Sequence, residues 1–376
     1  MTATAAPATT RPVISAWSAV SPYGLGAQAL VDGLRSGRST AAPVDTARWG
    51  VPEGPAHLVP GFETRQVLGK KGTRSMDRVT GLAVSVVGGL LDQPEADRER
   101  ETGERAALVL GTTTGSAESM MDFTRTSLLG EAPFDVDPAV MPNAVMNCAA
   151  GQCSIWYGIR GPNTTLAQGR TAGLAALHYS TRLLSSGRAG SVLCTAAEEF
   201  SRARYWLERH SRAAEAGDAG YDAEVALGEG AAALLVQRPD TLSPARPALA
   251  EILAVRTRVA TGDRVRPVLE ACVASALEAA GARPHDVWAA SPSDAPGRLG
   301  VCERQALTAL FGAEAVERVP GVGRLGDVSA ASATFQIAFL LATAALSDEA
   351  AGRLAVITSA DRDGSLACAV LRLVAP

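Results

Sequence analysis

The sequence has little charge for its size, and that charge is unevenly divided among residue types. Charged residues make up 20% of the chain, the formal net charge is −4, and lysine occurs only at Lys70 and Lys71 among 35 basic residues. Binding to nucleic acids or anionic membranes requires a strongly basic surface, which this balance does not supply. The chain also lacks the uninterrupted apolar run of about 20 residues that a transmembrane helix needs. We therefore expect neither nucleic acid nor a membrane as a partner.

Patterns that bind metals are missing as well. The six cysteines show no Cys-x-x-Cys spacing, and the four histidines are scattered along the chain. Unpaired cysteines are most often small buried apolar residues, and most of these six stand in apolar segments. We expect no metal ion, no cofactor and a location in the reducing cytoplasm.

Apolar residues, in contrast, are plentiful. They account for 47% of the 376 residues, which is enough to fill a large core. Apolar or β-branched runs alternate with segments of helical periodicity on both sides of the proline-rich stretch Pro239–Pro247. The alternation predicts a layered α/β protein with mixed sheets, divided into two comparable halves at residues 1–240 and 241–376.

The segment that organises the first half is a predicted strand–turn–helix. The β-branched run Thr164–Leu166 predicts a buried strand, and leucines at helical spacing between Leu174 and Leu184 predict a buried helix. The tight turn Ala167–Thr171 joins them, with Arg170 expected at its apex. A side chain there lies near unpaired backbone N–H groups, which can stabilise a thiolate or an oxyanion. Arginine stays protonated, so Arg170 cannot serve as a nucleophile or a base.

The residues around this turn resemble the nucleophile segment of β-ketoacyl synthases. Gly161-Pro162-Asn163, followed by Thr164–Gly173, is similar to the family pattern that runs from Gly-Pro through a turn like Thr-Ala-Cys-Ser-Ser-Gly. Counted from Gly161 without a gap, the family's catalytic cysteine falls on Arg170. The resemblance implies the thiolase-like fold, with layers in the order α-β-α-β-α and two pseudo-duplicated halves that each contain a mixed five-stranded sheet. Further segments that look like the family's are Lys71–Arg78, Met141–Gly151 and Gly228–Leu235.

The other catalytic groups of that family are also replaced in this chain. The turn that would carry its first histidine is Trp288–Asp294, which contains none. The family's Gly-His turn matches Gly326-Asp327, so Asp327 stands at the second histidine, and Val322 falls at the lysine five residues earlier. The segment Ala360–Gly364 stands in place of a Gly-Phe-Gly-Gly loop. No covalent acyl-transfer apparatus remains at these positions.

Other nucleophiles and bases are present, but their settings favour structural roles. Ser291 and Ser293 are expected to be solvated turn serines, because serine is a common turn residue. We expect His178 to pack within the helix after the elbow and His285 to lie in a loop. An enzyme with an unrecognised nucleophile stays open as an alternative.

The inactive proteins that this chain resembles are the chain-length factors of type II polyketide synthases. The resemblance implies a subunit without catalysis of its own, which pairs with an active ketosynthase and shapes the tunnel in which the polyketide grows. The partner would supply the catalytic cysteine and histidines, and an acyl carrier protein would carry the growing chain. The better-known aromatic members have glutamine at the cysteine position, so Arg170 indicates a divergent branch, such as one serving highly reducing, polyene-type assembly lines. Two alternatives stay open: a stand-alone thiolase-fold acyltransferase or decarboxylase, and a homodimeric acyl-binding protein.

The resemblance also implies where the tunnel and the subunit interface lie. Met121, Thr124 and Leu128, spaced i, i+3 and i+7, share one face of a predicted helix at Ser119–Leu129. The resemblance implies that they line or cap the tunnel near the interface, and an ordinary core face is the alternative. The strand Thr164–Ala167 resembles the one that the family places at the apolar face between subunits.

A cluster of arginines follows the strand after the elbow. Carrier proteins are acidic as a family, so a basic surface is where one is expected to dock. An ordinary solvated face is the alternative, because exposed charges contribute little on their own. The cluster consists of Arg202, Arg204, Arg209 and Arg212.

The arginine at the elbow needs a carboxylate if it is buried. An unpaired guanidinium would be prohibitively costly inside the protein, and here it also meets the positive end of a helix dipole. In ketosynthases the elbow cysteine and the second histidine face one another, so we expect an ion pair between Arg170 and Asp327. Asp294 and Glu198 are the alternative acceptors.

Overall fold

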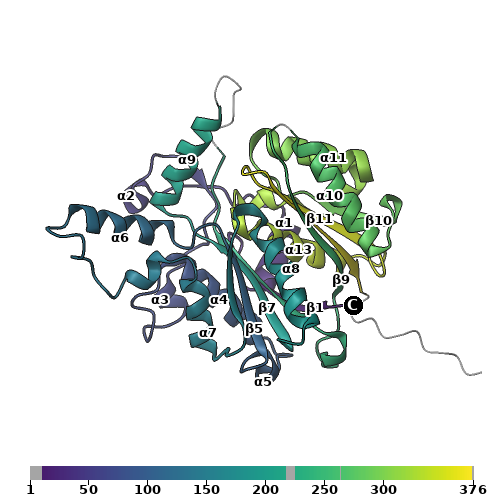
Figure 1. Ribbon diagram of the computed structural model, residues 1–376, viewed down its shortest axis with the longest axis horizontal. Helices are drawn as coiled ribbons and strands as arrows, with labels where there is room; N and C mark the ends of the chain where they lie inside the picture. The colour runs from purple at the N-terminus through teal and green to yellow at the C-terminus, as the bar shows by residue number, and fades with distance from the viewer. Residues whose placement is uncertain (1–10, 217–224, 263, 375–376) are drawn as a thin grey trace, which may run out of the picture.

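One large mixed sheet forms the frame of the molecule (Figure 1). The computed structural model describes residues 11–216, 225–262 and 264–374. Within them the first half contributes the strands β6 (Asn163–Ala167), β5 (Ala106–Thr112), β7 (Ser191–Glu198), β8 (Gly230–Gln237) and β1 (Val13–Ser21), in that spatial order. The second half continues the sheet with β9 (Ala250–Val259), β12 (Ser365–Leu373), β11 (Leu354–Ala360) and β10 (Val287–Ser291).

The join between the two halves lies at the start of β1. Val13 pairs with both Gln237 of β8 and Glu251 of β9, and Ile14 also pairs with a residue of each strand. The predicted mixed α/β architecture is confirmed. The prediction of a mixed five-stranded sheet in each half fits the first half, which contributes five strands, but not the second, which adds four strands among the described residues. Because β1 pairs on both edges, the two sets of strands form one continuous sheet.

Helices cover the sheet in layers (Figure 1). Two helices pack between the halves, and the central core contains side chains from both of them and from both halves of the sheet. Every residue of the second of these helices from Ser332 to Ala342 is buried, as expected for a helix that is apolar on all sides. The central helices are α8 (Ala172–Ser185) and α13 (Ser332–Ala344), and the outer ones are α4 (Arg78–Leu91) and α7 (Cys148–Tyr157) on the first half, and α10 (Val265–Ala280) and α11 (Gly297–Phe311) on the second.

The two central helices begin in matching ways. Each follows a single 3-10 turn, η2 (Gly169–Thr171) before α8 and η7 (Ser329–Ala331) before α13. The first residue of each turn has a left-handed backbone, with φ of 51° at Gly169 and 36° at Ser329. The helices approach closely, since a Cβ on Gly173 would lie 2.9 Å from the Cβ of Ala333. This packing brings the two turns together.

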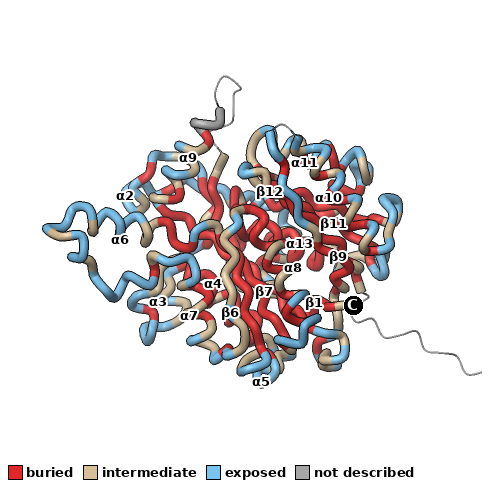
Figure 2. The backbone as a smooth tube through the Cα atoms, viewed as in Figure 1, coloured by how far each residue is buried: buried red, intermediate tan, exposed pale blue. Residues whose placement is uncertain are grey.

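Two helices leave the body of the protein on one side. In the view of Figure 1, α6 (Ala117–Leu129) runs to the left and α9 (Arg202–Ala216) to the top. Ala117 is the only buried residue of α6, and Figure 2 shows the helix almost entirely in the colours of exposed and partly exposed residues. The alternative that Met121, Thr124 and Leu128 form an ordinary core face is therefore wrong.

The remaining elements are short or lie at the edges of the fold. None of the helices in the described ranges is long and apolar enough to cross a bilayer. These elements are β2 (Gly24–Leu25), α1 (Ala27–Ser36), β3 (Ala42–Pro43), α2 (Thr46–Trp49), β4 (Pro55–Ala56), α3 (Thr64–Val67), α5 (Arg98–Glu101) and α12 (Ala313–Glu317), with β3 and β4 forming a small second sheet.

Candidate functional site

Arg170 stands at the apex of the elbow between β6 and α8, as the sequence predicts. Its side chain is 7% exposed and that of Asp327 is 3% exposed, and the Arg170 Nη2 atom lies 2.6 Å from Asp327 Oδ1. The predicted ion pair is confirmed. The Arg170 Nη1 atom also donates a hydrogen bond to the hydroxyl of Ser332, at 3.1 Å. The two alternative acceptors are engaged elsewhere, Glu198 with Thr113 and Asp294 with Arg304.

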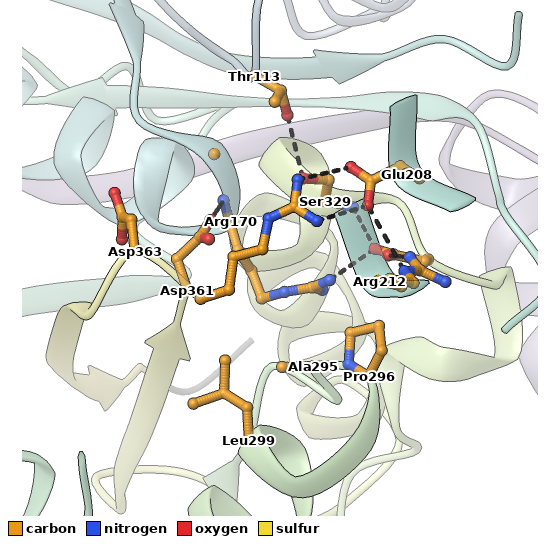
Figure 3. Close-up of a pocket in the computed structure, with 13 residues that line it drawn as sticks. Thr113, Arg170, Glu208, Arg212, Ala295, Pro296, Leu299, Ser329, Asp361 and Asp363 are labelled. Carbon is orange, nitrogen blue, oxygen red and sulfur yellow. Dashed lines mark hydrogen bonds and ion pairs between the residues drawn. The ribbon is translucent and has the colours of Figure 1, made fainter. Parts of the chain in front are cut away.

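A second arginine, which the sequence did not predict here, completes the pair. Arg212 of α9 donates to the other carboxylate oxygen of Asp327, so one carboxylate lies between two buried guanidinium groups. Figure 3 shows Arg170 and Arg212 reaching this point from different sides of the pocket. Burial alone would raise the pKa of Asp327, but Arg170, Arg212 and the nearby Arg204 together hold it well below its usual value. Asp327 is therefore ionised in the folded protein at any ordinary pH.

The arginines of α9 do not form the predicted surface cluster. Arg204 and Arg212 are 4% and 5% exposed, so the prediction that they contact a carrier protein is wrong for both. Arg204 donates to the backbone carbonyls of Glu199, Gly228 and Asp327, because α9 turns this face toward the protein. Arg204, Glu208 and Arg212 follow one another at intervals of four residues. This spacing indicates that they share one face of the helix.

The two remaining arginines of that cluster lie on the exposed side of α9. Arg202 forms ion pairs with Glu118 and Asp122 of α6. The guanidinium of Arg209 lies over the ring of Trp206, 5.9 Å from its centroid. Both remain accessible to a partner.

The backbone at the elbow is blocked as well as the side chain. The Arg170 N–H donates to the carboxylate of Asp361, which lies in the turn between β11 and β12. Backbone N–H groups at such an elbow are the donors that stabilise a developing oxyanion, and here a carboxylate already occupies one of them. Asp361 also fills the space beside Gly169, where a Cβ would lie 2.2 Å from its Oδ2 atom. Asp361 belongs to the segment Ala360–Gly364 that stands in place of a Gly-Phe-Gly-Gly loop, and nothing local in the sequence predicts this contact.

Little room remains at the elbow. The cavity has a volume of about 130 Å³ and is lined by charged side chains from Arg170, Arg212, Asp327, Asp361 and neighbouring residues. Its two hydroxyls, on Thr113 and Ser329, lie 3.0 Å from each other and have no histidine partner among the described residues. The arrangement provides salt bridges and hydrogen bonds but no activated nucleophile.

The other candidate groups lie in structural settings. Ser293 is fully buried and donates to Glu303, so the prediction of a solvated turn serine is wrong. Ser291 is also buried, and its carbonyl accepts from Gln336. Val322, at the lysine position, is an apolar core residue that is 1% exposed. His285 is exposed beside Asp286, in a loop turn as predicted.

The helix face predicted from the spacing of Met121, Thr124 and Leu128 lines one open groove. This groove has a volume of about 930 Å³ and lies between α6 and α9. Trp206 and Leu207 of α9 form the wall opposite α6. Leu128 is 78% exposed and Met121 is 45% exposed. Large apolar side chains that lie together in a groove are seldom so exposed to water. The three residues share a face as expected, and that face is uncovered in the single chain.

Comparison with known families agrees with the elbow and the turns described above. Residues 10–241 match the model of the Beta-ketoacyl synthase, N-terminal domain. The chain belongs to the β-ketoacyl synthase family. Its curated relatives include the 3-oxoacyl-[acyl-carrier-protein] synthase 2 of Vibrio cholerae serotype O1, 28% identical over 146 residues (39% of this chain and 35% of the relative), and that of Coxiella burnetii, 27% identical over 245 residues (60% and 58%). The matches cover less than two thirds of the length of either relative.

Solved structures narrow the position of the chain within the family. The ishigamide ketosynthase/chain length factor superposes with a TM-score of 0.91 at 43% identity, over 97% of this chain and 100% of the other. The protein is a homologue of the ketosynthase/chain length factor proteins of type II polyketide synthases. A type II acyl-carrier protein in complex with its ketosynthase, AntDE:AntF, has a TM-score of 0.78 at 15% identity over 97% and 100% of the two chains, which shows the shared fold alone.

The three-residue charge cluster generates a stability prediction. Asp327→Ala removes the ion pair of Arg170, leaves Arg212 only its longer contact with Glu208, and should lower the free energy of unfolding by about 3–5 kcal/mol. Arg170→Met should cost less, because Asp327 keeps its bond to Arg212. Replacing all three residues by apolar ones should recover most of the loss. Urea unfolding measures all three variants, and equal losses for Asp327→Ala and Arg170→Met would contradict the role assigned to Arg212.

The blocked elbow generates a second prediction. Arg170→Cys should not restore acyl transfer. The backbone N–H of residue 170 already donates to Asp361 and cannot stabilise an oxyanion. Asp327, still paired with Arg212, stands where the family has its second histidine, so the histidine that would transfer the proton is missing. Incubation with a radiolabelled acyl thioester, followed by gel analysis, measures acylation at Cys. Stoichiometric labelling of this variant, absent from Arg170→Ser, would overturn the assignment.

Proposed function

We propose that this chain is the non-catalytic chain-length factor of a type II polyketide synthase, acting in a highly reducing, polyene-type system. The observation that carries the proposal is the Arg170–Asp327–Arg212 cluster, which fills the position of the family's nucleophile inside an otherwise complete fold. The 43% identity with the ishigamide ketosynthase/chain length factor supports the type of assembly line. The catalytic cysteine and histidines belong to a ketosynthase partner, and an acyl carrier protein brings the growing chain to the pair.

The free surface of the chain favours an obligate partner. β6 is the last strand of the sheet and pairs only with β5 among the described strands, so its other edge is open for pairing. A long segment near it exposes many large apolar side chains, far more than an isolated surface tolerates. These side chains belong to Met121, Leu128, Leu129, Phe134, Val140, Met141, Val145, Met146 and Ile155. We call this segment the apolar ledge.

The groove between α6 and α9 is the proposed wall of the polyketide tunnel. Met121, Thr124 and Leu128 line it in the single chain, and Met121 and Leu128 also belong to the ledge that the partner would cover. A hydrocarbon chain gains free energy from burial in such an apolar groove. Arg202 and Arg209, on the exposed side of α9, are available to an acidic carrier protein.

The two alternatives differ in testable ways. A stand-alone acyltransferase or decarboxylase needs an accessible nucleophile, and neither Ser293 nor the hydroxyls at the elbow has one of the usual activating partners. A homodimeric acyl-binding protein would cover the apolar ledge with a second copy of this chain. Association with a ketosynthase separates that alternative from the heterodimer.

Association is the first experiment. Co-expressed with a ketosynthase of a related assembly line, the tagged chain should co-purify with it as a heterodimer, whereas the chain alone should self-associate. Phe134→Glu, on the ledge, should weaken the heterodimer about tenfold or more, because it places a charge in an apolar interface. Leu346→Glu, an equally apolar exposed position outside the ledge, is the matched control. Sedimentation of a clean monomer that is unaffected by the ketosynthase would refute the proposal.

Product length is the second experiment. Thr124→Trp should shorten the polyketide made by the heterodimer, because the larger ring fills the groove. Thr126→Trp is the control, since Thr126 is also exposed on α6 but lines a different cavity. Mass analysis of the products measures the effect, and unchanged length in a folded pair carrying Thr124→Trp would reject the tunnel assignment.

A further inference from the structure

The helix α6 has no apolar anchor of its own. Beyond Ala117 none of its residues is buried, so packing against the core does not fix its direction. Its first turn, in contrast, is held by polar contacts to the body of the protein. At 1.5 Å per residue the helix is about 20 Å long. A small tilt at its first turn therefore moves its far end, where Leu128 lies, several times farther than it moves the first turn.

Glu199 makes the central contact. It directly follows β7, which pairs with a strand on each side, and it is 1% exposed. Its Oε1 atom accepts from the hydroxyl of Ser116, at 3.0 Å, and from the backbone N–H of Glu118, at 3.4 Å. Its Oε2 atom accepts from the backbone N–H of Val79 in α4, at 3.2 Å. One carboxyl group therefore ties the first turn of α6 to the first turn of a core helix and to the sheet.

A second carboxylate joins α6 to α9. Glu118 accepts from the backbone N–H of Ala203, at 2.7 Å, and forms an ion pair with Arg202, at 2.8 Å. The two helices are thus held together at their first turns and diverge toward their far ends, which forms the groove (Figure 1). The Glu118 contacts set the position of α6 relative to α9, and the Glu199 contacts set it relative to the rest of the protein.

We propose that Glu199 is a positioning residue that fixes the direction of α6 and thereby the length of acyl chain that the groove admits. The inference rests on the proposed function, because it assigns Glu199 a part in chain-length control. Glu199 would not touch the acyl chain itself. It would act through the first turn of α6 on Met121, Thr124 and Leu128.

Burying a carboxyl group here has a free-energy cost. Burial raises the pKa of Glu199 to about 8, and the negative charge of Asp77 adds to this effect. The charged groups that face it are Asp77, which caps α4, Glu198, its neighbour along the chain, and Arg78 of α4. A glutamine would have the same shape, but its amide group would place a donor against either Val79 N–H or the donors of α6.

The test compares Glu199→Gln with Glu303→Gln. Glu303 is also fully buried, and it accepts from the hydroxyls of Ser293 and Thr358, but it has no contact with α6. Hydrogen exchange of the backbone amides at the start of α6, in the chain alone, should become about tenfold or more faster in Glu199→Gln and stay unchanged in Glu303→Gln. The heterodimer with Glu199→Gln should release a broader mixture that contains longer products, while the Glu303→Gln pair keeps the original product.

Titration supplies a further readout. Amide exchange is itself base-catalysed, so protection factors rather than raw rates are compared. In the unaltered chain, protection at the start of α6 should increase as the pH rises through about 8, because the ionised Glu199 accepts hydrogen bonds on both oxygens, and the product mixture should change with it. Glu199→Gln should abolish both changes, and Glu303→Gln should retain them. A merely structural role would lower stability without altering the product mixture.

Each outcome decides a separate point. Unchanged exchange in Glu199→Gln refutes the anchor, and faster exchange with an unaltered product mixture refutes the link to chain length. If Glu199→Gln does not fold, Glu199→Asp keeps the carboxyl group on a side chain one methylene shorter and should produce the same changes to a smaller extent. Failure of the proposed function would appear independently, as a chain that binds no ketosynthase while the exchange result still holds.

Discussion

The carboxylate of Asp327 pairs with two buried guanidinium groups, and the arrangement around it depends on this single negative charge. Arg170 comes from the elbow of the first half, Arg212 from the exposed arm of α9, and Asp327 from the turn before α13. Without it, Arg170 would lose its ion pair and Arg212 would keep only the longer contact with Glu208, at 3.5 Å, so both buried charges would be poorly compensated. A buried ion pair adds little stability compared with apolar residues of the same volume, but it does impose one geometry on the three segments that meet there.

The substitutions around the elbow are distributed over several parts of the chain. Arginine replaces the nucleophile, an aspartate stands at a histidine position, and the turn between β11 and β12 sends the Asp361 carboxylate to the backbone donor of the elbow. The matching turns before α8 and α13 explain how the fold accommodates these substitutions. Both turns keep a left-handed first residue, and each leads into a central helix that packs in the core. The framework of a ketosynthase is thus retained, with a charge cluster at the elbow.

Much of this framework could be predicted from the sequence, for physical reasons that are local. Buried strands such as β7 appear as short apolar runs, and the elbow appears as a β-branched run followed by leucines at helical spacing. The Arg170–Asp327 pair followed from the requirement that a buried guanidinium be neutralised. Arg212 and Arg204 could not be placed in the same way, because nothing local distinguishes an arginine facing the core from one facing water. The bond from Arg170 N–H to Asp361 and the double pairing of β1 likewise depend on contacts between residues far apart in the chain.

The pairing of β1 has a consequence for synthesis of the protein. β1 ends at Ser21, yet its main partners are β8 and β9, which end at Gln237 and Val259. Because a chain is made from its N-terminal side, this central strand is synthesised long before those partners, and only the two-residue strand β2 can pair with it early. Long-range pairing of this kind is slow, and unpaired apolar strands associate readily. The nascent chain is therefore open to aggregation until β8 and β9 have been made.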